Sequence, residues 1–233
     1  MKKFYKLVTI QKENNLYKIH LDGKIIKTPS GGQLSSDNKE VAEIIMEEWA
    51  SQTDVINPKT MPVTQIITTF MDRVSKERDA MHDLLVAYFN TDLICYHAPD
   101  PPEMKNRQEK EWGKWLDWFE QRYNHKLDIT YGLSAIKQAD DINWVIDREV
   151  RNLSDINFTL LQLVTSISGS IILGLAFIYK SASPEDIFNA TNVEESIKAE
   201  IYNEAFYGKS PTQEKQANTM IRDLNAAKAI LDS

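Results

Sequence analysis

Residues 158–179 read FTLLQLVTSISGSIILGLAFIY, a stretch without a formally charged side chain that is long enough to span a bilayer. A glutamine, two threonines and several serines interrupt it, and its flanks lack aromatic anchors and a cluster of lysine or arginine. These features favour a buried core helix, which we expect over about residues 157–180. Ser166, Ser170 and Gly174 recur every four residues and predict a seam of small side chains against a neighbouring helix. A membrane-attached assembly factor anchored by this stretch is the alternative.

Helical spacing of apolar residues continues on both sides of this stretch. On its N-terminal side an apolar stripe covers residues 67–88, and tryptophans and other apolar residues recur over 104–123. On its C-terminal side, Ser183-Pro184 and Ser210-Pro211 each place a capping hydroxyl before a proline, which is typical of a helix start. We expect further helices at about 138–153, 184–205 and 211–231.

The beginning of the chain has a different pattern. Residues 4–10 and 15–21 alternate as strands do, and Asp22-Gly23 in LDGKII is typical of a tight hairpin turn. A helix is expected over about 38–52, and TDVINPKTMP ends it with two prolines. The sequence therefore predicts an α+β fold with two parts: a small β-rich domain with one helix over residues 1–59, and a larger, mainly α-helical domain over 60–233.

Composition narrows the possible functions. The 34 aspartates and glutamates outnumber the 27 lysines and arginines, and the net charge of −7 disfavours nucleic acid as a partner. Cys95 is the only cysteine and the four histidines are scattered, so we expect no disulfide framework and no metal site. Adjacent carboxylates such as Glu47-Glu48 are expected on solvated faces. The start MKKFYKLVTI reads as a strand and not as an export signal, which predicts a bacterial cytoplasmic protein, or a mitochondrial matrix protein if it is a mature eukaryotic form.

One segment contains residue types that could form a catalytic site. In NTDLICYHAPD, residues 90–100, Cys95 and His97 would share one face of an extended segment and could act as thiol and base. The thiol could instead pack in an apolar core, and no oxyanion loop or third orienting group is recognisable. Gly208-Lys209-Ser210 matches the end of a phosphate-binding loop, but Asn203 stands where that motif needs a glycine. We therefore expect neither catalysis nor a cofactor; a small thiol-dependent hydrolase using Cys95 and His97 is the alternative.

Several short segments resemble a known family when they are taken together. They are LDGKIIKTP, EWASQ, MPVTQ, DRV and TDLICYHA, followed by Gln108 and Trp112. In this order and spacing they resemble the ATP synthase α-subunit assembly chaperones of mitochondria and α-proteobacteria, the ATP-twelve type. The chain departs from the family pattern at Lys24 and His97, where the family usually has arginine, and around Asn203 and Tyr207-Gly208 near the C-terminus. Residues of the shared motifs are expected to be structural: Asp22, Gly23, Thr28, Pro29, Glu48, Trp49, Gln52, Met61, Pro62, Thr64, Asp72, Arg73, Thr91, Asp92, Cys95, Tyr96, Gln108 and Trp112.

The resemblance implies a function without catalysis. It implies an assembly chaperone that binds the newly made α subunit of the ATP synthase catalytic head and prevents its aggregation until the β subunit displaces it, and we expect the chain to be a monomer. Neither nucleic acid nor stable membrane insertion is expected. The client surface should be a broad patch of aromatic anchors with a charged rim. The residues expected on it are Trp118, Glu200, Glu204, Phe206, Tyr207 and Glu214.

Overall fold

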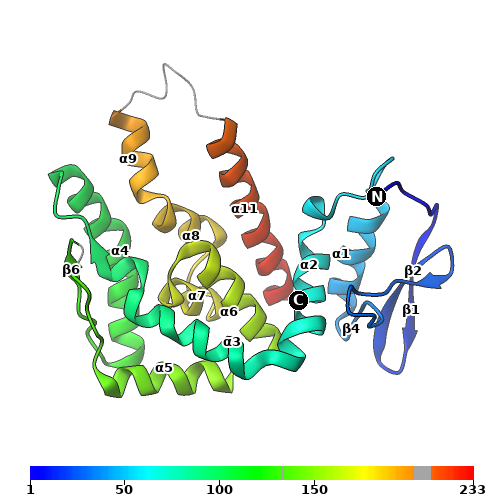
Figure 1. Ribbon diagram of the computed structural model, residues 1–233, viewed down its shortest axis with the longest axis horizontal. Helices are drawn as coiled ribbons and strands as arrows, with labels where there is room; N and C mark the ends of the chain where they lie inside the picture. The colour runs from blue at the N-terminus through cyan, green and yellow to red at the C-terminus, as the bar shows by residue number, and fades with distance from the viewer. Residues whose placement is uncertain (133, 202–210) are drawn as a thin grey trace. The chain divides into compact units, whose positions relative to one another are not determined.

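The computed structural model describes residues 1–132, 134–201 and 211–233 (Figure 1). The chain forms two compact units, which are described separately below. The first contains Met1–Arg78 together with Asn225–Ser233, and the second contains Asp79–Leu224. A small sheet lies in the first unit and most of the remaining residues are helical, which confirms the predicted α+β class.

A four-stranded antiparallel sheet begins the first unit. Its strands are β1 (Val8–Glu13), β2 (Leu16–Leu21), β3 (Lys24–Ile25) and β4 (Ser35–Ser36). β1 pairs with β2 from Val8↔Leu21 to Glu13↔Leu16, while β3 and β4 both pair with β2. The predicted turn joins β2 to β3, with Asp22 and Gly23 at φ 47° and 80°. These left-handed angles match the twist of a two-residue hairpin loop.

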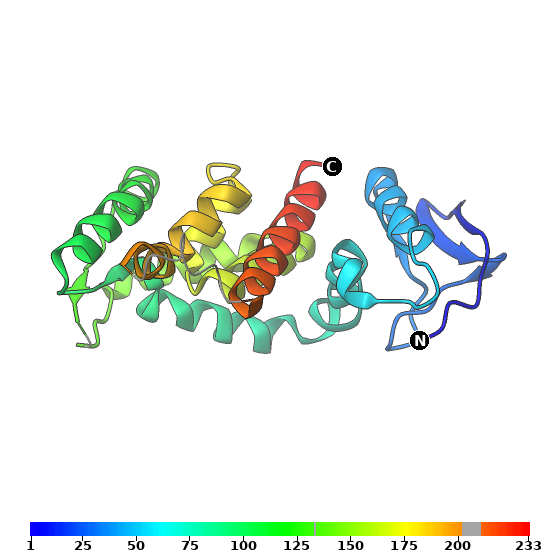
Figure 2. The same ribbon diagram turned by 90° about the horizontal axis from the view of Figure 1, so that it is seen from above.

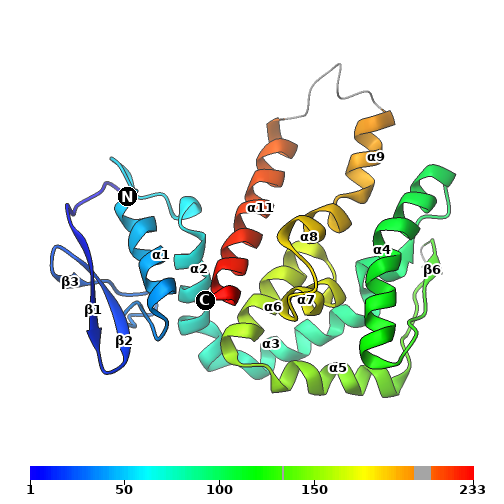
Figure 3. The same cartoon turned by 180° about the vertical axis from the view of Figure 1, so that it is seen from behind.

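Helix α1 (Lys39–Ala50) packs on this sheet and buries Val41, Ala42 and Ile45 (Figure 3). Its N-terminal cap is Asn38, whose side-chain oxygen accepts from the backbone N–H of Glu40 at 2.8 Å. After a short 3-10 turn (η1, Pro58–Thr60), α2 (Pro62–Thr69) continues through a π-helical turn (η2, Phe70–Val74) into α3 (Ser75–Ala87). The stripe predicted over 67–88 is therefore not one regular helix. Glu77 has φ −123° and ψ 16°, which adds a kink within α3.

The two compact units divide the chain at a different place from the predicted domains. Residues 60–78 group with the sheet because α2 packs on α1, and the end of α11 (Pro211–Asp232) also belongs to this unit. A compact unit need not fold independently of the rest of the chain, so the domain boundary after residue 59 stays a prediction.

The second unit is built mainly from helices that surround α6 and α7 (Figure 2). Two short strands, β5 (Tyr96–His97) and β6 (Thr130–Tyr131), pair in parallel. The largest buried side chains of the unit include Phe89, Trp112 and Phe158. Its other elements are η3 (Tyr88–Thr91), η4 (Leu93–Cys95), α4 (Pro102–Tyr123), α5 (Asp140–Asn152), α6 (Asp155–Ser168), α7 (Ile171–Ile178), α8 (Pro184–Thr191), α9 (Val193–Ile201) and the first part of α11.

The apolar stretch 158–179 forms two helices, so the single helix expected over 157–180 is wrong. Gly169 ends α6 in the left-handed conformation at φ 72°, and the Ser170 side chain caps the start of α7. Neither half approaches the length of a bilayer-spanning helix, and none of the helices within the described ranges is long and apolar enough to cross a membrane. Both halves are largely buried, as expected for core helices.

The predicted seam of small residues is correct at one position only. A Cβ on Gly174 would lie 2.7 Å from Leu161 Cδ1 and 2.8 Å from Thr165 Oγ1, so glycine is needed where α7 meets α6. Ser170 is buried as a helix cap, and Ser166 is exposed. The seam fails because the break at Gly169 takes Ser166 and Ser170 out of one helical register.

The helix expected over 184–205 is also divided. α8 ends at Thr191 and α9 begins at Val193, with Asn192 between them at φ −100° and ψ 18°. The predicted start of α8 is confirmed, because Ser183 and Asp186 form a reciprocal capping box. Residues 202–205 lie outside the described ranges.

Candidate functional site

The thiol-and-base pair considered from the sequence does not form in the structure. Cys95 ends the 3-10 turn η4 and is 1% exposed, and burial raises the pKa of its thiol well above the usual range. His97 lies on β5, where its Nε2–H donates to the carbonyl oxygen of Ile94 at 3.1 Å, and burial lowers its pKa. Gln138 Nε2 approaches Cys95 Sγ at 3.8 Å. A thiol that resists ionisation, beside a histidine engaged elsewhere, does not support a hydrolase.

Asp92 in the same segment has a structural role. Its Oδ1 accepts from the backbone N–H of Ile94 at 3.2 Å, and its Oδ2 accepts from that of Ile172 at 3.0 Å. The carboxylate therefore caps both η4 and the first turn of α7. It is fully buried, and burial raises its pKa to about 7. Asp92 joins the TDLICY segment to the break between α6 and α7.

Shared-motif residues of the first unit also form structural bonds. Glu48 on α1 reaches the start of α2: its Oε1 accepts from Val63 N at 2.7 Å, and its Oε2 accepts from Thr64 N at 2.7 Å and Thr64 Oγ1 at 2.6 Å. Thr28 Oγ1 donates to Asp72 Oδ1 at 2.6 Å, which ties the loop after β3 to the π-helical turn. Glu48 is therefore a helix cap, and the expectation that it lies on a solvated face is wrong.

The remaining motif residues of this unit lie in turns and at helix ends. The Gln52 side chain donates to Glu48 O and accepts from Asn57 N. Arg73 pairs with Glu77 at 3.6 Å on the surface. The other motif residues are Asp22 and Gly23 in the β2–β3 turn, Pro29 in the loop after β3, and Trp49 near the end of α1. Met61 and Pro62 lie at the start of α2.

In the second unit, motif residues on α4 hold α8 and α9 in place. Trp112 Nε1 donates to the carbonyl oxygen of Ala190 at 2.8 Å. Gln108 accepts from Ala98 N at 2.6 Å and donates to Glu194 Oε1 at 3.2 Å. Thr91 lies in η3, and Tyr96 Oη donates to Asn90 O at 2.9 Å beside it. Since Trp112 and Gln108 are almost completely buried, α4 acts as a fixed support for the α8–α9 pair.

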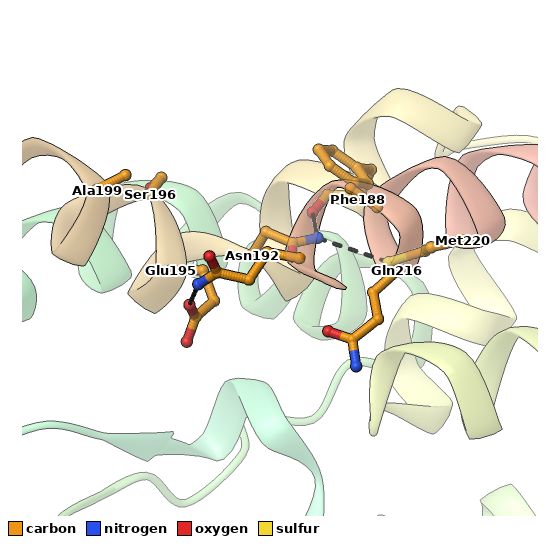
Figure 4. A pocket seen from close by; sticks show the side chains of 9 residues that line it. Phe188, Asn192, Glu195, Ser196, Ala199, Gln216 and Met220 are labelled. Carbon is orange, nitrogen blue, oxygen red and sulfur yellow. Dashed lines mark hydrogen bonds between the residues drawn. The ribbon is translucent and has the colours of Figure 1, made fainter. Parts of the chain in front are cut away.

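A groove lies between this pair and the first part of α11 (Figure 4). It has a volume of about 230 Å³ and mixes apolar with polar side chains. Asn192 Nδ2, at the α8–α9 break, donates to Phe188 O at 2.8 Å and lies 3.5 Å from Met220 Sδ on α11. Across the groove, Gln213 Nε2 donates to Glu195 Oε2 at 3.2 Å. The lining residues are Phe188, Asn192, Glu195, Ser196, Ala199, Gln213, Gln216, Ala217 and Met220.

Carboxylates lie on the helices that form the groove, and one of them, Glu195, lines it. Glu195 also pairs with Lys198 at 3.0 Å, and the hydrogen bond from Lys198 lowers the pKa of this carboxyl. Glu200, near the end of α9, pairs with Arg107 of α4 at 3.0 Å. Glu214 lies exposed in the first turn of α11. The groove therefore combines carboxylates with a small apolar surface.

The structure places the expected client-binding residues unevenly. Glu200 and Glu214 lie on the helices that form the groove. Trp118 does not line it; this half-buried ring packs edge-on against Tyr123 near the end of α4. Three of the expected residues, Glu204, Phe206 and Tyr207, lie outside the described ranges.

The lining residues Phe188, Asn192, Gln213 and Met220 were missed from the sequence. Asn192 was missed because a single helix was expected across the α8–α9 break, and its neighbours Thr191 and Val193 are the only local signal for a break there. Phe188 and Met220 read as ordinary apolar positions of a helix. Gln213, in the first turn of α11, gives no sequence signal for a groove.

The motif residues are structural and the thiol is buried, whereas the groove mixes apolar and polar side chains, which suits contact with another polypeptide. Comparison with known proteins defines the class further, because residues 2–120 match the ATP12 chaperone protein family. The chain therefore belongs to the ATP12 chaperone family, a family of chaperones for ATP synthase assembly.

Relatives and solved structures agree with this family. The chain is 21% identical to the mitochondrial protein atp12 of Schizosaccharomyces pombe, over 83% of the chain and 70% of the relative. It is 22% identical to mitochondrial ATP12 of Saccharomyces cerevisiae, over 84% and 72%. The crystal structure of Atp12 from Paracoccus denitrificans has a TM-score of 0.86 at 26% identity and covers 99% of this chain and 97% of that one. A protein of Agrobacterium tumefaciens has a TM-score of 0.89, also at 26% identity, with coverage of 100% and 85%.

Proposed function

We propose that this chaperone binds the unassembled α subunit of the ATP synthase catalytic head and prevents its aggregation until the β subunit displaces it. A subunit of an obligate ring exposes a large apolar interface before assembly, and a partner that covers this interface suppresses wrong association. Release needs no nucleotide hydrolysis, because a tighter-binding β subunit can displace the chaperone by mass action. We also propose that the protein is a monomer, that it acts in the bacterial cytoplasm and that it has no catalytic activity.

The groove between α8, α9 and α11 is the observation that carries this proposal. Phe188, Ala199 and Met220 supply apolar contacts, and the Gln216 amide can hydrogen-bond to a peptide backbone. Carboxylates outnumber basic side chains on the described parts of these helices: Glu185, Asp186, Glu194, Glu195, Glu200, Glu214, Asp223 and Asp232 against Lys198, Lys215, Arg222 and Lys228. The surface therefore fits a client segment that is apolar at its centre and basic at its edges.

Co-expression with the α subunit tests the proposal. Wild-type chaperone should keep the α subunit soluble and co-purify with it, and added β subunit should release it. Aggregation of the α subunit despite abundant soluble chaperone would show that the proposed function is wrong.

A charge-reversal pair tests the surface. Glu195→Lys with Glu214→Lys should lower capture of the α subunit about tenfold or more, because both changes oppose a basic client rim. Glu43→Lys with Glu47→Lys on α1 is the matched control, since each pair contains one glutamate that forms an ion pair with a nearby lysine. Both variants should stay within about 1 kcal/mol of wild type in urea unfolding. Equal capture by the two variants would exclude the groove as the client site.

A further inference from the structure

The strand β1 has one unpaired edge among the described residues. It pairs only with β2, and the hairpin turn at Asn14 and Asn15 fixes which backbone groups that pairing uses. A two-residue loop makes its flanking residues, Glu13 and Leu16, a hydrogen-bonded pair, and such pairs alternate along an antiparallel ladder. The bond from Asp22 N to Leu7 O at 2.9 Å agrees with this register. The alternate residues Val8, Ile10 and Lys12 therefore direct their N–H and C=O groups away from the sheet.

Exposed apolar side chains continue from this edge. Phe4 is 65% exposed and Leu7 is 59% exposed, directly before β1. Val55, which forms an isolated bridge with Lys2, is 56% exposed. Most large apolar side chains in a folded unit are covered, so this group next to free backbone groups is suited to contact with another chain.

The same segment is basic in a chain that is acidic overall. Residues 1–36 contain two carboxylates, Glu13 and Asp22. They contain seven lysines: Lys2, Lys3, Lys6, Lys12, Lys18, Lys24 and Lys27. In the part of the chain that the structure describes, Lys18 is the one member of this set that forms an ion pair, with Glu13 at 2.6 Å. Lys12 lies on β1 and Lys2, Lys3 and Lys6 precede it, so positive charge accompanies the outward edge of β1, whereas Lys18, Lys24 and Lys27 lie on β2, on β3 and after β3.

We propose that β1 receives an extended, acidic segment of a partner protein as an added antiparallel or parallel strand. The outward-facing backbone groups of β1 supply the hydrogen bonds to the added strand. The exposed apolar side chains pack against alternate side chains of the partner, and the lysines favour a partner segment with negative charge. A second copy of this chain is a poor occupant, because edge-to-edge pairing would bring the lysines of both copies together. A lipid surface would use the charge but not the row of backbone donors. This inference goes beyond the proposed function, since it concerns a second surface with the opposite charge preference.

Amide hydrogen exchange on the full chain tests the proposal. The probe is a synthetic peptide of about eight residues that alternates valine with aspartate, compared with one that alternates valine with lysine. The acidic peptide should slow exchange at Val8, Ile10 and Lys12 by about tenfold or more and leave the already bonded amides of Thr9 and Gln11 unchanged. No slowing with the acidic peptide, or equal slowing with the basic one, would overturn the proposal.

A proline variant provides an independent test. Lys12→Pro removes one outward N–H without removing a bond of the β1–β2 ladder, whereas Lys12→Ser removes the charge and keeps the N–H. Acidic-peptide binding should weaken about tenfold more for the proline variant than for the serine variant. Equal binding by both would exclude strand addition. If anionic phospholipid vesicles slow exchange at these amides and the acidic peptide does not, the surface binds lipid and the proposal is wrong.

The α subunit distinguishes this inference from the proposed function. If the chaperone captures the α subunit and acidic peptides do not protect the edge, the proposed function stands and the strand-addition surface is wrong. If acidic peptides protect the edge and the α subunit is not captured, the surface stands and the proposed client is wrong.

Discussion

Replacing Glu48 by glutamine should destabilise the start of α2. The carboxylate accepts three hydrogen bonds from Val63 and Thr64, at 2.6 to 2.7 Å, and lies at a helix N-terminus that has no cap of its own. Glutamine keeps one acceptor oxygen and points its amide N–H₂ at backbone donors. Loss of charge-assisted bonds contributes about 1.5–3 kcal/mol, and loss of the charge–dipole interaction about 0.3–1 kcal/mol. We expect a total loss of about 2–4 kcal/mol in the free energy of unfolding.

Hydrogen exchange and urea unfolding together measure this effect. Exchange at the amides of Val63 and Thr64 should accelerate in Glu48→Gln, because one of the two carboxylate oxygens is replaced by an N–H₂ group and the remaining oxygen is an uncharged, weaker acceptor. Glu47→Gln is the matched control: this neighbouring side chain is exposed, and its change should stay within about 0.5 kcal/mol. A double-mutant cycle with Thr64→Val should give a coupling of about 0.5–3 kcal/mol. A Glu48→Gln variant as stable as the Glu47→Gln control, or a coupling of zero, would refute this account of the cap.

Three further results are expected. Burial raises the pKa of Asp92 from 3.8 to about 7, so its protonated form stabilises the folded chain below pH 4, and this stabilisation is lost as the pH rises toward 7. The difference in unfolding free energy between wild type and Asp92→Asn should therefore change by up to about 4 kcal/mol over that range, and a difference that does not vary with pH in urea unfolding would contradict this. Gly174→Ala should cost about 1–3 kcal/mol, because the new methyl group clashes with Leu161 and Thr165; an unchanged thermal midpoint would disprove this close packing. Cys95 should react with a thiol reagent only after unfolding, and rapid labelling of the native chain would show that the thiol is accessible.

Local sequence signals predicted the features that local chemistry determines. The turn at Asp22-Gly23 depends on two residues that tolerate positive φ, and the start of α8 depends on Ser183 and its neighbours. The α+β class and the burial of the apolar stretch follow from periodicity over short windows. The shared motifs identified the family even though each one is short.

Features that depend on distant residues could not be predicted in the same way. Nothing beside Glu48 in the sequence shows that its carboxylate caps a helix beginning at Pro62. Gly169 and Ser170 supply the local caps at the break but stand in an apolar run that reads as one helix, and the further bond from Ile172 N to Asp92 joins residues 80 positions apart. The groove needs the separation of α8 from α9 and the return of α11, so its lining combines segments that share no local pattern.

The break between α6 and α7 also matters while the chain is being synthesised. An uninterrupted apolar helix leaving the ribosome would present a hydrophobic segment long enough for membrane-insertion machinery to engage. Asp92 precedes its hydrogen-bond donor, the backbone N–H of Ile172, by 80 residues, so its carboxylate is synthesised well before the apolar stretch emerges. The group that caps the second half of the stretch is thus already present when that half appears.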